Sequence, residues 1–150
     1  MKSYQSRGFT LIELVVVITI LGILAAFAIP KFIALDSQAR IATVNGLVGT
    51  VKSAAALARS LGMATGNPAS VTMEGSPVAM LNNYPDSPAG GIPNAINVSV
   101  SDFTYAPGAS GAVGTWTRVG APGAAGTCVV TYTPAAVNGT PVVVAVTTGC

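Results

Sequence analysis

The hydrophobic pattern divides the chain into a continuous apolar run, an amphipathic stretch and an alternating C-terminal part. Residues 9–29 form the apolar run, and the one charged side chain in it is Glu13. A helix rises about 1.5 Å per residue, so this run would span roughly 31 Å, close to the hydrocarbon thickness of a bilayer. An acid at the centre of a membrane helix costs roughly 2.5–3.5 kcal/mol. The position of Glu13 therefore needs an explanation.

The next stretch, residues 31–61, predicts an amphipathic helix, because apolar side chains recur at spacings of three and four. Gly62 and the cluster Gly66-Asn67-Pro68 predict its end. Lys52 and Arg59 lie well away from the apolar stripe, so we expect the stripe to pack against a globular head. The stripe consists of Val44, Leu47, Val51, Ala54, Ala58 and Leu61.

Gly22 and Pro30 interrupt the N-terminal helix. Pro30 has no N–H to donate and clashes with the carbonyl of Ala26, so the helix should bend or loosen there. Gly22 weakens a helix by about 1 kcal/mol relative to alanine. We expect a continuous, bent helix in the free subunit and assign helix flexibility to these two residues.

The remainder of the chain predicts an antiparallel sheet. Residues 71–80 predict a small hairpin about Glu74-Gly75, and residues 82–93, with three prolines and two glycines, are expected to be irregular. Four strands are expected over residues 96–105, 115–119, 128–133 and 142–148. The predicted fold is α+β: one long N-terminal helix, half apolar and half amphipathic, packed on a sheet of about four strands.

Composition narrows the chemistry. Charged residues make up 8% of the 150 residues, apolar residues 51%, and histidine is absent. The chain therefore lacks the base of Ser-His-Asp and Cys-His catalysis and the commonest metal ligand. The five acids are dispersed in sequence, and there is no basic patch of the kind that nucleic-acid binding needs. We expect no enzyme activity, no cofactor, no metal site and no direct nucleic-acid contact.

Cys128 and Cys150 are the two cysteines. Two unrelated buried thiols are one interpretation, and a structural disulfide, which oxidising compartments favour, is the other. A bridge between them would contribute roughly 3 kcal/mol in the chain-entropy model.

The N-terminal segment has three interpretations. In the first it is a secretory signal peptide, with Lys2 and Arg7 ahead of the apolar region and Ala26-Phe27-Ala28 as an A-x-A cleavage site. In the second it is a plain membrane anchor, whose N-terminus the positive-inside rule places in the cytoplasm. Neither accounts for Glu13.

The third interpretation rests on the residues Gly8-Phe9-Thr10-Leu11-Ile12-Glu13. A short basic leader ending in glycine, followed by Phe-Thr-Leu-Ile-Glu and an apolar helix, closely resembles the prepilin signature of type IV pilins and their relatives. The resemblance implies cleavage after Gly8 by a prepilin peptidase, N-methylation of Phe9, and assembly into a helical fibre. It also implies that Glu13 pairs in the fibre with the new amine of Phe9 on a neighbouring subunit. It further implies that Cys128 and Cys150 form a disulfide, which would correspond to the C-terminal disulfide loop of type IV pilins.

This resemblance divides the chain into five parts: a leader (residues 1–8), a transmembrane and assembly helix (9–30), the amphipathic helix of the head (31–61), a loop with a small hairpin (62–95), and a sheet with a disulfide loop (96–150). The Ala/Gly-rich helix and the Tyr84-Pro85 element look most like the mannose-sensitive haemagglutinin branch. Local melting between Gly22 and Pro30 is expected in the fibre.

The expected function is that of the major structural subunit of a type IV pilus. The subunit would wait in the inner membrane until an assembly machinery lifts it into a surface homopolymer serving adhesion, motility or DNA uptake, with an unknown receptor. A minor pilin or a type II secretion pseudopilin is the alternative. A membrane-anchored extracytoplasmic binding module or enzyme is the remote one.

Overall fold

The computed structural model describes residues 8–150, which form two units: residues 8–37, and the head, Gln38–Cys150. Helix α1 (Leu11–Ala64) belongs to both units and contains Pro30 without a break in its helical assignment. This agrees with the continuous helix expected for the free subunit. In residues 8–37 no side chain is buried.

Just after its last residue, Ala64, helix α1 is followed by residues in the left-handed backbone conformation. Gly66 and Asn67 have φ angles of +85° and +55°, and the amide of Asn67 donates to the carbonyl of Gly62 at 2.6 Å. Glycine and asparagine tolerate this conformation, and the bond back into the helix satisfies one of its last free carbonyls. Pro68 follows and prevents continuation. The helix thus ends three residues beyond the predicted end at residue 61.

A three-stranded sheet follows, with the strand order β1-β2-β3. Strands β1 (Ser70–Met73) and β2 (Ser76–Leu81) form the predicted hairpin, whose turn residues Glu74 and Gly75 both have positive φ. Such two-residue turns match the twist of the flanking strands. Strand β3 (Tyr84–Pro85) pairs with β2 through a second turn of this kind at Asn82-Asn83.

The segment predicted to be irregular, residues 82–93, is therefore partly regular. It contains β3 and the beginning of a short 3₁₀ helix, η1 (Ile92–Ala95). The prolines do not exclude these elements, because Pro85 lies at the edge of its sheet and Pro93 lies in the first turn of η1.

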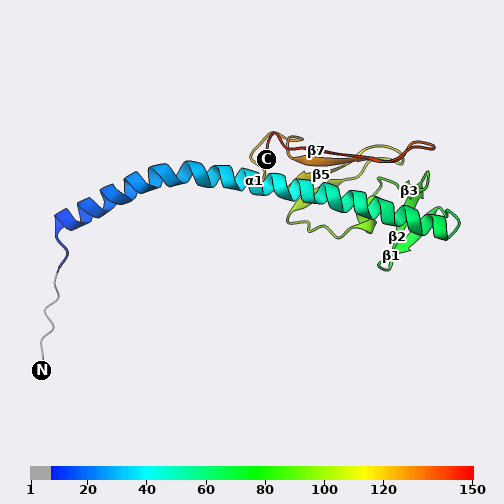
Figure 1. The fold of residues 1–150 in the computed structure, drawn as a ribbon, viewed down its shortest axis with the longest axis horizontal. Helices are drawn as coiled ribbons and strands as arrows, with labels where there is room; N and C mark the ends of the chain where they lie inside the picture. Colours follow the sequence, from blue (N-terminus) through cyan, green and yellow to red (C-terminus); the bar gives the residue numbers. More distant parts are fainter. Residues whose placement is uncertain (1–7) are drawn as a thin grey trace, which may run out of the picture. The chain divides into compact units, whose positions relative to one another are not determined.

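The second sheet is antiparallel, in the order β4-β5-β6-β7. Its strands are β4 (Phe103–Ala106), β5 (Gly114–Arg118), β6 (Val129–Thr133) and β7 (Val142–Val146). Figure 1 shows this sheet along the second half of α1, with the β1–β2 hairpin near the end of the helix. The α+β architecture and the four-stranded sheet are as predicted.

The first strand of this sheet is much shorter than the predicted residues 96–105. The chain turns at residues 100–102, where the amides of Asp102 and Phe103 both donate to the carbonyl of Ser99. Pairing begins at Phe103, opposite Arg118, which is the last residue of β5. The residues before Phe103 alternate between apolar and polar side chains, but they have no neighbouring strand to pair with and therefore do not form a strand.

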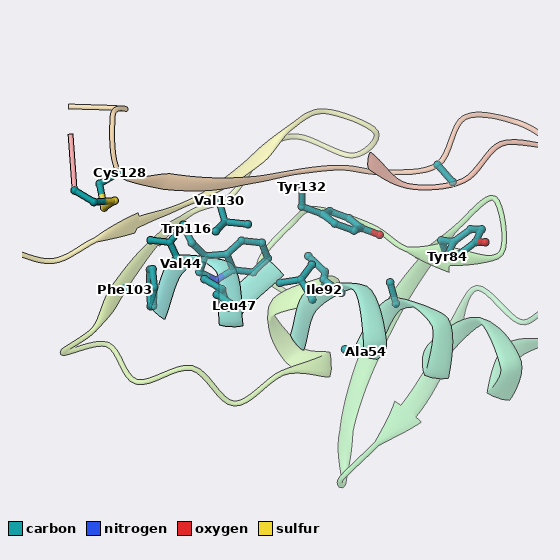
Figure 2. Close-up of a cluster of buried hydrophobic side chains, with 14 residues drawn as sticks. Val44, Leu47, Ala54, Tyr84, Ile92, Phe103, Trp116, Cys128, Val130 and Tyr132 are labelled. Carbon is teal, nitrogen blue, oxygen red and sulfur yellow. A yellow bond between two sulfur atoms is a disulfide. The ribbon is translucent and has the colours of Figure 1, made fainter. Parts of the chain in front are cut away.

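The core lies between α1 and the four-stranded sheet. Trp116, Val130 and Tyr132 point from the sheet toward the helix, where Val44 and Leu47 meet them (Figure 2). Five of the six residues of the predicted stripe are buried, whereas Leu61 is half-buried. A second, smaller cluster joins the hairpin to the end of α1 through Ala58, Val71, Met73 and Val78.

Candidate functional site

The first turn of α1 places Thr10 and Glu13 in contact. The backbone N–H and the hydroxyl of Thr10 donate to Glu13 Oε2 at 2.9 and 2.6 Å, and the Glu13 amide lies 3.3 Å from Thr10 Oγ1. This is a capping box, in which two side chains satisfy helix-terminal N–H groups reciprocally. The sequence Thr-x-x-Glu was the available signal for it, and our sequence interpretation of Glu13 did not include this role.

Gly8 and Phe9 lie immediately ahead of this cap. Both residues are exposed, and neither belongs to a helix or strand. The peptide bond between them is thus outside the hydrogen-bonded part of α1, where a protease could approach it. An amine formed at Phe9 would be directly adjacent to the capping residue Thr10.

The apolar half of α1 is exposed in the isolated chain. Helix α1 is the one candidate membrane span among the described residues, and its most apolar window has a mean hydropathy of 2.8 with no residue buried. Large side chains such as Leu11, Ile23 and Phe27 are mostly accessible. A soluble monomer rarely exposes an apolar patch of this extent, so this surface needs lipid or another protein to cover it.

Gly22 and Pro30 lie inside α1. A Cβ at Gly22 would meet no atom within 4 Å, so packing in the monomer does not require glycine there. The predicted flexibility of this segment in a fibre is not tested by the helix of the single chain.

Cys128 and Cys150 form a disulfide, with their Cα atoms 4.9 Å apart. Both residues are buried, and Arg40 Nη1 on α1 donates to the main-chain oxygen of Cys150 at 3.1 Å. The bridge joins the start of β6 to the segment after β7. Together with the Arg40 bond it holds that segment against α1, so the structural-disulfide interpretation is confirmed.

Asp86 is the buried acid of the head. Its carboxylate accepts hydrogen bonds from the amides of Ser87 and Gly111, at 2.8 and 2.9 Å, and from the hydroxyl of Ser110. Two tyrosines also donate hydrogen bonds to the backbone on either side of Asp86: the Tyr105 hydroxyl to the carbonyl of Ser87, and the Tyr132 hydroxyl to the carbonyl of Pro85. Asp86 therefore joins the loop after β3 to the loop between β4 and β5. Nothing in the sequence pattern indicated this network.

Burial, and secondarily the charge of Asp86, raises the pKa of Tyr105 to about 12, and the same two causes raise the pKa of Tyr132 above its ordinary value. Both hydroxyls thus remain neutral donors at ordinary pH. Among residues 8–150 no three histidine, cysteine or acidic side chains come together as a metal site.

Arg59 is the second residue whose surroundings the sequence did not indicate. It lies 4.6 Å above the ring of Tyr84, and its Nη1 donates to the hydroxyl of that tyrosine. Arg59 is half-buried although it lies away from the apolar stripe of α1, because Tyr84 packs on it from a different side of the helix. The β3 segment, which carries Tyr84, covers this side of the helix.

Comparisons with known proteins find similarity in the N-terminal segment of this chain. The model of the prokaryotic N-terminal methylation motif matches residues 4–29. The type IV narrow pilus major component PilA5 of Thermus thermophilus is 50% identical over 54 residues, which are 36% of this chain and 47% of that protein. The type IV major fimbrial protein FimA of Dichelobacter nodosus is 44% identical over 54 residues, 36% of this chain and 34% of that protein.

The type II secretion system core protein G of Pseudomonas aeruginosa is 41% identical over 54 residues, 36% of this chain and 38% of that protein. The chain thus spans less than half the length of these relatives. No solved structure matches it. The similarity to these pilus and secretion-system proteins thus extends over about a third of the chain, and the matched methylation motif lies at its N-terminus.

Proposed function

We propose that this chain is the major structural subunit of a type IV pilus. The observation that carries the proposal is the acid at the start of an exposed apolar helix, one turn after a Gly8-Phe9 bond that lies outside the helix.

Processing would convert this segment from a membrane anchor into an assembly element. A prepilin peptidase would cut after Gly8 and methylate the new amine of Phe9, which removes Lys2 and Arg7 with the leader. The remaining chain has five basic and five acidic side chains. Near-neutral subunits repel one another weakly, which suits close packing in a polymer.

Glu13 would then pair with the Phe9 amine of a neighbouring subunit. A carboxylate offers about four acceptor positions, so it can keep the Thr10 bonds within its own subunit while binding this amine. A buried charge is stable only when paired and hydrogen-bonded, and the two groups satisfy each other in this arrangement. The apolar surface of α1 would exchange lipid for contact with other helices.

Before assembly the chain would reside in the inner membrane, and afterwards in a filament on the cell surface. An assembly machinery in the inner membrane would extract it. The exposure of α1 over its apolar half and the absence of buried side chains in residues 8–37 support both stages. Melting between Gly22 and Pro30 would let subunits nest within the fibre. Membership of the mannose-sensitive haemagglutinin branch remains a prediction.

The test compares the full chain with its Glu13→Ala variant. The variant should reach the membrane at normal levels, because the substitution makes the span more apolar. It should be missing from filaments sheared off the cell surface. Normal filaments from the Glu13→Ala variant would contradict the pairing role.

A pseudopilin of a type II secretion system is the second candidate, and the 41% identity to core protein G favours it. The two differ in abundance, since a pilus is built mainly of its major subunit. If this chain is only a trace component of sheared filaments, the pseudopilin or minor-pilin assignment replaces the major-subunit proposal.

A further inference from the structure

A polar pocket of about 500 Å³ lies on the head, beside the C-terminal part of α1. Its walls are the helix, the turn between β2 and β3, and the loop that precedes β7. Its volume is within the range of roughly 300–1,000 Å³ common for small-molecule sites. The polar lining consists of Arg59, Asn82, Asn83, Tyr84, Asn138 and Thr140.

Arg59 presents a fixed positive charge to this pocket. Its guanidinium lies over the Tyr84 ring, and Nη1 donates to the Tyr84 hydroxyl. In residues 8–150 it makes no other hydrogen bond and no ion pair with a carboxylate. A guanidinium has five N–H donors, so most of those of Arg59 are available to a ligand.

The acids of the head do not neutralise Arg59. Asp86 is buried and bonded to its own loops, and Asp102 pairs with Arg118 at 3.2 Å. Glu74 lines a separate, apolar groove. The charge of Arg59 therefore has no counterpart among the described residues of its own head.

The asparagine walls of the pocket are held in place by the backbone. Asn82, Asn83 and Asn138 have φ angles of 50°, 67° and 58°, and Asn82 Nδ2 donates to the carbonyl of Ala135 at 2.8 Å. This bond ties the β2–β3 turn to the loop before β7. The carboxamides of Asn83 and Asn138 and the hydroxyl of Thr140 are exposed, and within residues 8–150 they form no hydrogen bond.

We propose that this pocket binds a carboxylated sugar of the uronic-acid type. A guanidinium binds a carboxylate through two parallel hydrogen bonds, and the sugar acid would meet Arg59 in this way. Carboxamides and a hydroxyl both donate and accept, which matches the hydroxyl groups of the same sugar ring. An acidic side chain from a second copy, such as Glu74, would use Arg59 alone and leave the other polar groups without partners.

The test is a calorimetric titration of the full-length chain, solubilised in a detergent without a sugar headgroup. The probes are glucuronate, glucose and acetate. Glucuronate should bind, whereas glucose and acetate should each bind at least about tenfold more weakly, a loss of roughly 1.4 kcal/mol. Arg59→Gln should weaken glucuronate binding by a similar factor. Lys52→Gln, which removes an exposed cation from the same helix outside the pocket, should leave it unchanged.

Arg59 also packs on Tyr84, so a second variant guards against misfolding. Asn83→Gly keeps the left-handed turn and removes only the carboxamide, and it should weaken glucuronate binding several-fold. The proposal is overturned if the unmodified chain does not bind glucuronate, if acetate binds equally well, or if neither pocket variant changes the affinity. It is also overturned if the chain self-associates through this pocket, in a manner that Glu74→Gln abolishes and glucuronate does not affect. None of these measurements depends on filament assembly.

Discussion

Thr10 and Glu13 exchange hydrogen bonds across the first turn of α1, with Thr10 Oγ1 2.6 Å from Glu13 Oε2. The acid thus stabilises the start of its own helix, in addition to the pairing between subunits that we propose. Glu13 has a different partner in each role. In the cap its partner is Thr10 of the same chain, and in the proposed pairing it is the Phe9 amine of a neighbouring subunit. They can therefore be separated by substitution.

The first prediction concerns the Thr10→Val variant. It removes the capping hydroxyl but keeps the charge of Glu13, so filaments should still assemble. Loss of a helix cap costs about 1 kcal/mol, equal to about a fivefold change in a local opening equilibrium. Hydrogen exchange at the amide of Glu13, which donates to the Thr10 hydroxyl, should accelerate by about that factor in detergent micelles. Loss of filaments as complete as that expected for Glu13→Ala would mean that the cap, rather than the charge, is what assembly requires.

The second prediction concerns the disulfide. The bridge joins residues separated by 22 positions, and its removal should cost the head roughly 3 kcal/mol of unfolding free energy. The Cys128→Ala/Cys150→Ala double variant should therefore melt at a markedly lower temperature. Reducing agent should lower the melting temperature of the unmodified chain and not that of the double variant. Equal melting of the two chains without reductant would show that the Arg40 contact alone holds the segment after β7.

The third prediction compares two adjacent glycines in the loop after β3. A Cβ at Gly91 would lie 2.0 Å from the carbonyl oxygen of Asp86, whereas one at Gly90 would meet nothing within 4 Å. Gly91→Ala must displace the backbone that carries the Asp86 network, and it should destabilise the head by about 2 kcal/mol or more. Gly90→Ala should stay within about 0.5 kcal/mol of the unmodified chain. Chemical denaturation of both variants checks this, and equal stabilities would show that the loop adapts freely.

The fourth prediction concerns alkaline pH. The pKa of Tyr105 is raised to about 12 in the folded head, and the pKa of Tyr132 is also raised, in both cases mainly by burial. Above the ordinary tyrosine pKa of about 10 the unfolded chain releases protons that the folded head retains. The contribution of these two hydroxyls to the unfolding free energy should therefore be constant up to about pH 10 and decrease as the pH rises toward 12.

Absorbance near the phenolate band, followed alongside circular dichroism, measures this dependence. Ionisation of Tyr105 and Tyr132 should coincide with loss of the fold. Ionisation of all tyrosines near pH 10 in a head that stays folded would contradict this prediction. It would show that the hydroxyls of Tyr105 and Tyr132 are not buried and hydrogen-bonded in the folded head.

Much of the fold follows from periodicity in the sequence. The stripe from Val44 to Ala58 is read correctly, because a helix with one buried face repeats its apolar residues every three to four positions. The hairpin at Glu74-Gly75 and the last three strands follow from turn residues between β-branched runs. The strand proposed for residues 96–105 fails before Phe103, because alternation alone does not supply a neighbouring strand.

The parts that could not be predicted depend on contacts between distant segments. Asp86 acquires partners at Ser110 and Gly111, and Arg59 acquires Tyr84, from loops that only the folded chain brings together. The capping box differs, since Thr10 and Glu13 are three residues apart and their spacing is itself a recognised signal. The resemblance to pilins directed the interpretation of Glu13 toward a neighbouring subunit and left its role in its own helix unnoticed.

The central claim, that this chain is processed after Gly8 and becomes the bulk of a surface filament, is tested most directly by mass spectrometry of filaments sheared from the cells. The account predicts that the most abundant protein begins at Phe9 and carries one methyl group on its terminal amine. A mature chain beginning at Ile29, as cleavage after Ala26-Phe27-Ala28 would leave, or the absence of this chain from the filaments, would contradict it.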